Sequence, residues 1–531
     1  MYVLSFLPFA YKGFIVRVEA DIRRGLPGFD ISGLASNAVR ESRERVRVAL
    51  RNSGYGFPQD RILINLAPAG IKKEGASLDL PIALALMSAA GLCPKASDIL
   101  VVGELELSGN IRGVPGVLAA VAAGMENGIL DFIVPLVNAA EASLIDGAHI
   151  AAASTLTDAV EILVQREETG FLPLFMPKNI PNTKSVFEGD FCEVCGQQRY
   201  KRILEIAAAG AHNLLVFGTP GAGKTMLARR LPSIMAPLTI EEALLVTRLH
   251  SLAGTLSTLP QRSEQQSGSK ISVCEYQQEN VLITQPPFRS PHHSASAQGI
   301  LGGGKTIRPG EISLAHYGVL FMDEAPQFRV NVLQALREPL EDKVISISRA
   351  ESSVKLPAAF QLLLAANPCP CGRLGIENGG CFCAGNDIYR YWKKFGGALL
   401  DRIELRVAVK NPSVASFTAP LEESSAVIAA RVNNAVCIQQ ERFKNTPLRR
   451  NSAIPAGSIA EYCPLTADAK MALNTAVAKL NLSGRALHGV MRVSRTIADL
   501  EGTDSISANQ ILEAIQHRRQ GDDPYDVFNL N

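Results

Sequence analysis

The stretch LLVFGTPGAGKT, residues 214–225, decides the fold of this chain. It begins as a short apolar run, which is typical of a buried strand, and the MLARRL that follows is typical of a helix. Between them lies the pattern G-x-x-x-x-G-K-T, from Gly218 to Lys224 and Thr225. Such glycines let backbone N–H groups surround a phosphate, while the lysine reaches the β- and γ-phosphates and the threonine hydroxyl ligates Mg²⁺. The stretch therefore predicts a strand–loop–helix unit that binds ATP and Mg²⁺.

A second apolar run, VLFMDE at 319–324, ends in two acidic residues. In enzymes with this loop, the aspartate at such a strand end holds Mg²⁺ and the next acid polarises the attacking water. Asp323 and Glu324 therefore favour hydrolysis over binding alone, and the alternative is a strand end that caps the next helix. The residues expected to contact the nucleotide around the loop are Gly218, Thr219, Pro220, Gly221, Ala222, Gly223, Lys224, Thr225 and Met226.

The bulk composition excludes several classes of protein. The chain has 531 residues, of which 47% are hydrophobic, and its formal charge is +2. At about 150 residues per domain, this length predicts three or four domains with cores of their own. The near-neutral charge demands no nucleic-acid or membrane partner, and no apolar stretch reaches the ~20 residues of a membrane-spanning helix. Because the N-terminus also lacks a basic leader and a cleavage site, we expect a cytoplasmic protein with reduced thiols.

Hydropathy patterns divide the chain into an N-terminal α/β domain (1–165), a linker (166–190), an ATPase core (191–410) and a helical domain (411–531). A polar stretch at 255–280 is expected to be an exposed insertion without a catalytic role. The first domain is predicted to hold strands at 62–68 and 99–107 and helices at 81–91 and 116–128. The last domain is predicted to hold helices at 422–443, 465–480, 485–501 and 507–519.

Longer strings in the core resemble one branch of the AAA+ superfamily. They are PFRSPHHSAS (287–296), GGGKTIRPGEISLAHYGVLFMDEAPQF (302–328), ALREPLED (335–342), LLLAANPCPCG (362–372) and LLDRIELRV (399–407). Over essentially its whole length the chain resembles the YifB/ComM family of magnesium-chelatase-like AAA+ ATPases. The resemblance implies an α/β fold, with a parallel P-loop sheet and flanking helices, a C-terminal helical lid, and an N-terminal domain like that of Lon protease and ribosomal S5 domain 2. It also implies a homohexameric ring that binds ATP between subunits.

The same resemblance implies roles for three further residues. Asn367, at the end of an apolar strand, matches a polar sensor that contacts the γ-phosphate or the attacking water. Arg402 matches an arginine that is supplied to the neighbouring subunit's nucleotide, where it would stabilise transition-state charge. Arg485, at the start of a helix in the lid, is the candidate second sensor. The alternatives are a strand-end cap for Asn367 and surface salt bridges for the two arginines.

Two segments are candidates for contact with a polymeric substrate. A hairpin of two alternating strands is predicted at 343–357. The resemblance implies that it faces the pore of the ring, where Lys343, Arg349 and Lys355 would bring positive charge, and the alternative is a solvated hairpin. Residues 389–395, YRYWKKF, interleave aromatic rings that stack on bases with cations that contact phosphates. Here the alternative is an ordinary helix that buries its aromatic side chains.

The cysteines are few but clustered. Four thiolates in a C-x-C…C-x-C arrangement can close a tetrahedral Zn²⁺ site, and sulfur ligands in a reducing compartment favour a metal over disulfides. Such a site would be structural, because it leaves no coordination position open. The spacing is tighter than the usual C-x₂-C, so a metal-free cluster is the alternative. We interpret a second pair, Cys192 and Cys195, as incidental. The four clustered residues are Cys369, Cys371, Cys381 and Cys383.

The N-terminal domain resembles the catalytic domain of Lon protease, whose chemistry needs a serine nucleophile and a lysine base. In EGASLDLPIALAL (74–86), the serine position falls on Asp79 when matched through the apolar helix and on Ser77 when matched through E-G-x-S. In NIRGVPGVLAAVAAG (110–124), Leu118 occupies the lysine position. Without that amine, nothing assists deprotonation of a serine hydroxyl. We therefore expect no peptidase activity, and a domain that forms the ring or binds partners.

Three kinds of function are compatible with such a motor. The family resemblance favours a motor that acts on single-stranded or branched DNA, as a helicase or in branch migration during recombination or natural transformation, with recombination proteins as partners and no membrane partner. A second reading is a magnesium-chelatase-I-like or MoxR-like ATPase that remodels a protein or metal-insertion complex. A nucleotide-switched scaffold is the third. The fused N-terminal domain, the cysteine loop and the aromatic–basic stretch favour DNA.

Overall fold

The computed structural model describes residues 1–176, 189–256, 281–304, 307–348, 353–375, 380–411, 422–480 and 482–519. Most of the predicted insertion at 255–280, part of the predicted linker at 166–190, and Arg349 lie outside these residues. The chain forms two compact units. Unit 1 consists of Met1–Lys184, Ile240–Ile283 and Gly303–Pro309, and unit 2 consists of Ser185–Thr239, Thr284–Gly302 and Gly310–Asn531.

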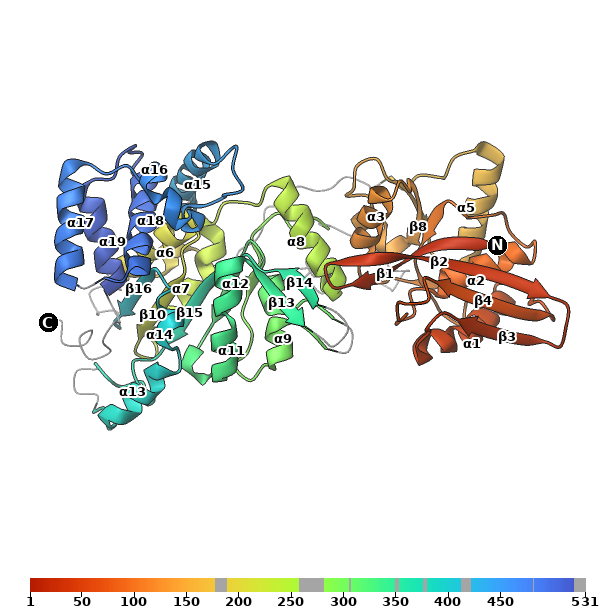
Figure 1. Cartoon of the computed structure of the whole chain (residues 1–531), viewed down its shortest axis with the longest axis horizontal. Coiled ribbons are helices and arrows are strands. Elements are labelled where there is room, and N and C mark those ends of the chain that lie inside the picture. Colours follow the sequence, from red (N-terminus) through yellow and green to blue (C-terminus); the bar gives the residue numbers. More distant parts are fainter. Residues whose placement is uncertain are drawn as a thin grey trace, which may run out of the picture. The chain divides into compact units, whose positions relative to one another are not determined.

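A seven-stranded sheet with the order β3-β4-β2-β1-β5-β8-β9 forms the centre of unit 1 (Figure 1). Strand β2 is antiparallel to both β1 and β4, and the other neighbouring pairs are parallel. The strands are β1 (Tyr2–Phe9), β2 (Lys12–Arg23), β3 (Gly28–Ser32), β4 (Arg61–Ala67), β5 (Ile99–Val101), β8 (Asp131–Pro135) and β9 (His149–Ala153). A separate antiparallel pair is formed by β6 (Glu104–Leu105) and β7 (Ile111–Arg112).

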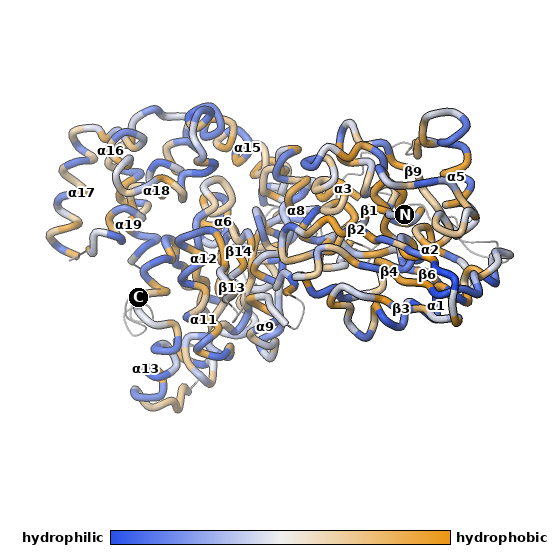
Figure 2. Tube along the Cα trace, turned by 45° about the vertical axis from the view of Figure 1, so that its right-hand side comes forward, coloured by the Kyte–Doolittle hydropathy of each residue, from blue (hydrophilic) through white to orange (hydrophobic). Residues whose placement is uncertain are grey.

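Helices cover this sheet, and their sequences match their burial. The helix α2 is apolar along its length and is buried on all sides, whereas the arginine-rich α1 buries one face and is hydrophilic over the rest (Figure 2). The helices are α1 (Asn37–Asn52), α2 (Asp79–Ala89), α3 (Val117–Glu126), α4 (Ala139–Ala142), α5 (Leu156–Thr169) and α8 (Ile240–Ala253), with a 3₁₀ turn η1 (Leu136–Asn138).

The predicted elements at 62–68, 81–91 and 116–128 are confirmed to within two residues by β4, α2 and α3. The single strand predicted at 99–107 is wrong. The N–H of Val102 still donates to Ile133 of β8, but that of Gly103 donates to the carbonyl oxygen of Ser77, and Glu104–Leu105 then form a separate pair with β7. Only β5, at the start of the apolar run, therefore pairs within the sheet.

Helix α8 follows the ATP-binding segment in sequence but is part of unit 1. Its Leu252 is buried in the same apolar cluster as Val117 and Val121 of α3. The hydroxyl of Ser251 donates to the buried carboxyl group of Glu141, which also accepts the N–H of Leu118 at 2.9 Å. A helix from the middle of the chain thus completes the core of the N-terminal unit.

Unit 2 is built on five parallel strands in the order β11-β12-β15-β10-β16 (Figure 1). Every residue of β10, β12 and β15 is buried, as expected for the centre of a parallel sheet with both faces covered. The strands are β10 (Leu214–Gly218), β11 (Phe288–Arg289), β12 (Val319–Met322), β15 (Gln361–Ala366) and β16 (Leu405–Val409). This parallel sheet confirms the predicted α/β fold class.

Short helices and a hairpin connect these strands. The helices are α6 (Gln198–Gly210), α7 (Lys224–Arg230), α9 (Ala297–Leu301), α10 (Glu311–Leu314), α11 (Val330–Ala335), α12 (Arg337–Asp342), α13 (Gly385–Lys393) and α14 (Gly397–Leu400). The 3₁₀ turns are η2 (Phe191–Glu193), η3 (Leu231–Ile234) and η5 (Ala325–Gln327). The antiparallel hairpin consists of β13 (Val344–Ser348) and β14 (Ser353–Pro357), which confirms the predicted hairpin.

Four of the C-terminal helices begin and end within three residues of the predicted bounds, and the short α16 (Ile459–Tyr462) was not predicted. The four are α15 (Ser425–Arg442), α17 (Ala467–Leu480), α18 (Gly484–Leu500) and α19 (Ala508–Arg519), and the 3₁₀ turns are η7 (Asn451–Ala453) and η8 (Ala456–Ser458). Apolar residues of α15, α18 and α19 share one buried cluster with α6 and the sheet. In the described part of the chain, no helix has both the length and the apolar composition that crossing a membrane requires.

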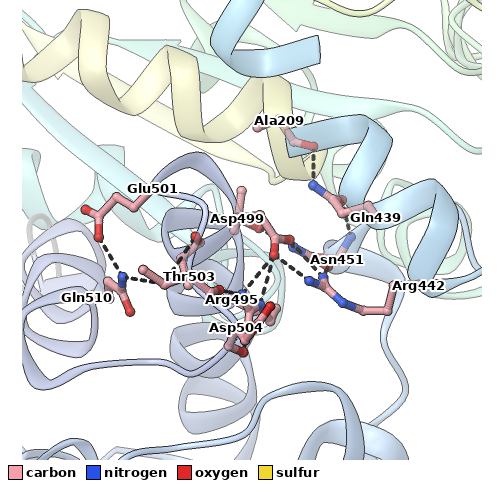
Figure 3. A network of polar contacts seen from close by, with 12 residues as sticks. Ala209, Gln439, Arg442, Asn451, Arg495, Asp499, Glu501, Thr503, Asp504 and Gln510 are labelled. Atoms are coloured by element: carbon pink, nitrogen blue, oxygen red, sulfur yellow. Dashed lines mark hydrogen bonds and ion pairs between the residues drawn. The ribbon is translucent and has the colours of Figure 1, made fainter. Parts of the chain in front are cut away.

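A buried polar network joins these C-terminal helices (Figure 3). The carboxylate of Asp499 on α18 accepts from both Arg442 on α15 and Arg495 one turn earlier on α18, at 2.5–3.1 Å. Asn451 donates to the same carboxylate at 2.7 Å. The side chain of Gln439 continues the network to the carbonyl oxygen of Ala209 on α6, at 3.1 Å. One buried carboxylate therefore neutralises two arginines at the junction of three helices.

Replacing Asp499 with asparagine should destabilise unit 2. The change leaves two guanidinium groups without a counter-charge, and breaking a buried pair in this way costs about 3–5 kcal/mol. Urea unfolding followed through the emission of Trp392, the single tryptophan of the chain, measures this loss. The matched control is Glu423→Gln, which removes an exposed carboxylate from Arg431 while the pairing of Arg431 with Glu205 remains, and it should cost less than about 1 kcal/mol. Equal losses in the two variants would contradict the expectation.

Two buried histidines should make the unit sensitive to acid. Burial lowers the pKa of His212 and of His316 to about 3. An unfolded histidine titrates near pH 6.5, so the unfolded chain binds more protons between these values and stability falls as the pH falls below about 6.5. From pH 7.5 to 5.5 we expect each histidine to remove about 1 kcal/mol of unfolding free energy. His212→Gln should abolish about half of this pH-dependent loss in urea unfolding, whereas the exposed His292→Gln should retain all of it.

Candidate nucleotide site

The phosphate-binding loop runs from the end of β10 to the start of α7. Gly218 ends the strand where β16 comes so close that a Cβ would lie 2.1 Å from the carbonyl oxygen of Val409. Gly221 and Gly223 have φ angles of 81° and 84°, in the left-handed region that favours glycine. The close approach at Gly218 and the positive φ angles at Gly221 and Gly223 therefore require glycine at these positions. The loop that they form turns the chain so that α7 begins at Lys224.

The ammonium group of Lys224 lies within the loop. It donates to the carbonyl oxygen of Gly218 at 2.7 Å, to that of the following residue at 2.9 Å, and to Oδ1 of Asn367 at 3.2 Å. Burial lowers the pKa of Lys224, and the carboxylate of Asp323 opposes this shift. Phosphate oxygens accept stronger, charge-assisted hydrogen bonds than carbonyl oxygens do. A phosphate at the loop would therefore compete successfully for this cation.

The two predicted magnesium ligands meet at the carboxyl edge of the sheet. The hydroxyl of Thr225 donates to one carboxylate oxygen of Asp323 at 2.7 Å, and the other oxygen accepts the N–H of Glu324 at 2.9 Å. They meet because β10 and β12, which lead to these residues, are both neighbours of β15. A hydroxyl and a carboxylate are oxygen ligands of the type that Mg²⁺ prefers. The donor set thus fits this ion.

Glu324 has a strained backbone, with φ 49° and ψ 44°. A residue other than glycine in the left-handed region is uncommon, and such strain costs about 1–3 kcal/mol and collects at functional sites. Asn367 follows β15, the strand between β10 and β12, and its amide oxygen is bound by Lys224. The structure therefore brings together Lys224, Thr225, Asp323 and Asn367, with Glu324 directly after the carboxylate.

Hydrogen bonds from side chains around the loop support it, and the sequence analysis did not single out two of the residues that form them, Tyr200 and Asn411. The hydroxyl of the fully buried Tyr200 donates to the carbonyl oxygen at the start of α7, at 3.1 Å. The amide of Gln197 donates to the carbonyl oxygen of Ala222 at 3.2 Å, and the hydroxyl of Thr219 donates to Asn411 at 2.9 Å. Single polar residues near a helix start and a strand end carry no distinctive spacing. The sequence pattern therefore gave no signal for Tyr200 or Asn411.

The two predicted arginines lie together in unit 2. Arg402 and Arg485 both donate to the carboxylate of Glu341 on α12, and Arg402 also donates to the carbonyl oxygen of Ala398 at 2.5 Å. Among the described residues, neither arginine hydrogen-bonds to the phosphate-binding loop of its own chain. A cavity of about 670 Å³ is lined in part by Glu341 and Arg402. Salt bridges, which were the alternative for Arg402 and Arg485, are thus present in the structure. A role of Arg402 at the nucleotide of a neighbouring subunit stays a prediction.

The four clustered cysteines converge. Their sulfur atoms all lie within 4.8 Å of one another. That of Cys369 is 3.3 Å from Cys371 and 3.7 Å from Cys381, and the last two are 3.6 Å apart. A tetrahedral Zn²⁺ with Zn–S bonds of about 2.3 Å has S–S edges of about 3.8 Å. A backbone N–H from Arg373 lowers the pKa of Cys371 to about 6, whereas burial raises the pKa of Cys369 to about 12. The group can hold a metal ion.

The aromatic–basic stretch divides between core and surface. Trp392 is 6% exposed, stands edge-on to Phe217 with ring centres 5.5 Å apart, and donates its indole N–H to the carbonyl oxygen of Pro368 at 3.0 Å. Phe395 is also buried, whereas Tyr389 is 64% exposed, and so the alternative of a helix that buries its aromatics is right for Trp392 and Phe395 but not for Tyr389. Phe382, between two of the cysteines, is 90% exposed.

The cations of the predicted pore hairpin differ in environment. Lys355 on β14 is exposed. Lys343 precedes β13, and burial lowers its pKa. Arg349 lies outside the described residues. Of the two cations that the structure describes, Lys355 is therefore the one open to a ligand.

The Lon-like positions of unit 1 hold no nucleophile–base pair. Asp79 begins α2 with its side chain fully buried, accepts from the hydroxyl of Ser42, and forms two hydrogen bonds with Arg45 at 2.7 and 3.0 Å. Leu118 is buried in α3. Ser77 is half-buried. A carboxylate fixed by an arginine stands where the apolar-helix match puts the Lon serine.

The fold and the site together define an ATPase of the AAA+ class, with a parallel P-loop sheet followed by a helical lid. Residues 190–270 and 255–417 match the family described as magnesium chelatase, subunit ChlI. Residues 18–138 match subunit ChlI of Mg-chelatase, and residues 422–518 match the C-terminal part of that subunit. The chelatase type of AAA+ module thus accounts for most of unit 2.

Relatives of full length identify the family. The chain is 38% identical to YifB of Escherichia coli over 95% of its own length and 94% of the relative. It is 37% identical to the competence protein ComM of Haemophilus influenzae, with the same coverage. The chain belongs to the YifB/ComM family of magnesium-chelatase-like AAA+ ATPases, which confirms the resemblance and implies ATP and Mg²⁺ as cofactors. A 136-residue stretch is also 29% identical to Lon protease 1 of Sorangium cellulosum, covering 24% of this chain and 17% of that protein.

Replacing Glu324 with glutamine should separate ATP binding from hydrolysis. The amide keeps the size of the side chain but removes the charge that is predicted to polarise water, and loss of such a group costs about 10²–10⁴-fold in rate. We expect the affinity for Mg-ATP, measured by calorimetry, to stay within about threefold. The reason is that the contacts that hold ATP before the reaction come from other residues and are unaltered. The exposed Glu441→Gln on α15 is the control and should behave as the unaltered protein. Phosphate release by the Glu324 variant within tenfold of the unaltered rate would refute its assignment.

Proposed function

We propose that the chain is an ATP-hydrolysing ring motor that acts on DNA. The observation that carries the ATPase half is the meeting of Lys224, Thr225, Asp323 and Asn367 at one edge of the sheet. In this proposal Lys224 binds the β- and γ-phosphates, and Thr225 and Asp323 hold Mg²⁺. Glu324 and Asn367 orient the attacking water. Phosphoryl transfer needs little more than such positioning and charge.

The proposed motor needs a second copy of the chain to complete its site. An arginine on the transferred phosphate is worth about 10³–10⁵ in rate in P-loop enzymes. Arg402 bonds to Glu341 and, among the described residues, to no part of its own phosphate-binding loop. This supports a homohexamer in which Arg402 exchanges Glu341 for the γ-phosphate of the neighbouring subunit. Arg485, on the same carboxylate, is proposed as the second sensor.

DNA is the proposed polymer. Phe382 and Tyr389 are exposed aromatic rings, and a stacked base contributes about 1–3 kcal/mol to binding of a single strand. Arg390 and Lys393 are exposed beside Tyr389, and Lys355 is exposed on the hairpin. The relative named competence protein ComM supports a role in DNA uptake or recombination. Single-stranded or branched DNA and recombination proteins are the partners we propose, with helicase or branch-migration activity.

Remodelling of a protein or metal-insertion complex is the second candidate. The observation that favours it is the match of most of the chain to the ChlI subunit of magnesium chelatase. An ATPase of that kind, or of the MoxR kind, would be stimulated by a partner protein and would ignore DNA. The response of the hydrolysis rate to DNA therefore separates the two functions.

We further propose that the cysteine cluster binds zinc and that the protein works in the cytoplasm, where thiols stay reduced. The sulfur–sulfur distances and the fourfold donor set support a closed, structural site. For the N-terminal domain we propose no peptidase activity. The buried Asp79, fixed by Arg45, and the apolar Leu118 support this, because proteolysis of the Lon type requires a serine and a lysine.

The DNA proposal predicts that single-stranded or branched DNA raises the ATPase rate and binds in a salt-sensitive manner. Affinity should fall steeply between about 50 and 200 mM salt, because phosphate contacts release counterions. The double variant Phe382→Ala/Tyr389→Ala should weaken binding by about 10-fold or more, measured by fluorescence anisotropy of a labelled oligonucleotide.

The matched control is Phe171→Ala, which removes an equally exposed aromatic ring from unit 1 and should leave the affinity for DNA unaltered. If DNA neither binds nor raises the hydrolysis rate at any salt concentration, the DNA function is wrong and protein remodelling becomes the favoured function. Equal losses from the Phe171 and Phe382/Tyr389 variants would refute the proposed surface alone.

A further inference from the structure

We infer that the cysteine cluster, once it binds zinc, positions Asn367 and the phosphate-binding loop, so that metal loading sets the rate of ATP hydrolysis. A closed zinc site is ordinarily a device for folding only. Here the loop that carries two of the thiolates also carries the sensor residue, and it packs against the nucleotide site. The inference rests on the ATPase activity proposed above and gives the metal a role in it.

The first link is the chain itself. Asn367 ends the apolar run of β15, and the first cysteine follows two residues later. Cys369 is fully buried, so its thiolate fixes the loop at an interior point. Because only Pro368 separates the two residues, a metal on Cys369 and Cys371 restricts the backbone that carries the amide of Asn367.

The second link is contact with the phosphate-binding loop. Gly372 has a φ of 75°, and a Cβ at this position would lie 2.8 Å from Cγ of Pro220. The same Cβ would lie 3.9 Å from Cγ of Asn367. The cysteine loop therefore rests directly on the phosphate-binding loop, at a separation that leaves no room for a methyl group.

The third link is the opposite side of the loop. Trp392 on α13 donates its indole N–H to the carbonyl oxygen of Pro368 and packs edge-on against Phe217 of β10, the strand that leads into the phosphate-binding loop. Helix α13 follows Cys383 directly. The cysteine loop is thus held between Pro220 on one side and Trp392 on the other, and the metal would close it.

These links predict an effect on catalysis rather than on ATP binding. Lys224 keeps its two backbone acceptors without Asn367, so binding of ATP is largely retained. Orientation in the transition state is more demanding, since a displacement of about 1 Å can cost about 10²-fold in rate. A metal that closes a loop also removes the conformational freedom of its ends. Loss of zinc should therefore lower kcat and leave the Kd for ATP nearly unaltered.

The test uses the full chain, loaded with zinc and then stripped with a chelator, with zinc content measured by mass spectrometry. We expect stoichiometric zinc, a fall in kcat of at least about tenfold on removal, a change in the Kd for Mg-ATP of less than about threefold, and recovery on adding zinc. Removal should also shift the emission of Trp392 and speed hydrogen exchange at residues 218–223 and 367–372. The last two readouts do not depend on hydrolysis.

Two variant pairs sharpen the test. Cys383→Ser should reproduce the stripped state, whereas Cys437→Ser on α15, whose thiol is exposed outside the cluster, should not. Gly372→Ala should keep zinc but lower kcat, because the added methyl group pushes the loop away from Pro220. Gly457→Ala is its control, since its φ is ordinary and a Cβ there meets nothing within 4 Å.

The outcomes separate this inference from the proposed function. If the protein takes up no zinc, or if stripping leaves both kcat and exchange at 218–223 unaltered, the inference is overturned. If the zinc-loaded protein hydrolyses no ATP, the proposed ATPase function fails, and the exchange and Trp392 readouts still decide whether the metal orders the loop. A fall in kcat that is matched by an equal weakening of ATP binding would also overturn it.

Discussion

The burial of one positive charge, that of Lys224, organises the nucleotide site. An ammonium group is removed from water only where oxygen atoms replace its hydration shell. Three acceptors do so here, two from the phosphate-binding loop and one from Asn367. The loop carbonyl groups require the glycine conformations at 221 and 223, and the amide of Asn367 requires β15 to lie between β10 and β12. The strand order and the loop geometry therefore meet at this cation, and the same parallel sheet brings Asp323 to Thr225.

The sequence predicted best what depends on neighbours along the chain. The loop, the acidic strand end and the lid helices depend on local spacing and on helical periodicity, and the structure has them within a few residues of the expected bounds. It predicted least well what depends on distant partners. Trp392 is buried because it packs against Phe217 and donates to Pro368, and the strand from Ile99 ends early because Gly103 bonds to Ser77 instead of to the neighbouring strand. Neither partner is visible from the pattern of the segment itself.

The same distinction applies within the candidate site. Spacing indicated four cysteines with the donor set of a metal site, but it did not indicate that Gly372 lies against Pro220. Motif matching pointed to Arg402 and Arg485 separately, and only the folded chain shows that both bind Glu341. Such meetings arise from tertiary packing, within the core for Gly372 and Arg402 and between core and lid for Arg485, which spacing along the chain does not encode. Here the structure adds connections between motifs rather than new motifs.

Helix α8 bears on how a protein of this kind can be divided or acquired. A domain joined by one linker can be exchanged as a cassette, either by gene fusion or by truncation. Here each unit is assembled from three separate stretches of the chain, and Ser251 and Leu252, encoded within the ATPase portion, complete the N-terminal core. A fragment that stops at Lys184 would leave the carboxyl group of Glu141 without its hydroxyl partner and α3 without its cover. The segments of the two units therefore alternate along the gene. Neither unit can be transferred to another protein as one continuous stretch without also carrying residues of the other unit.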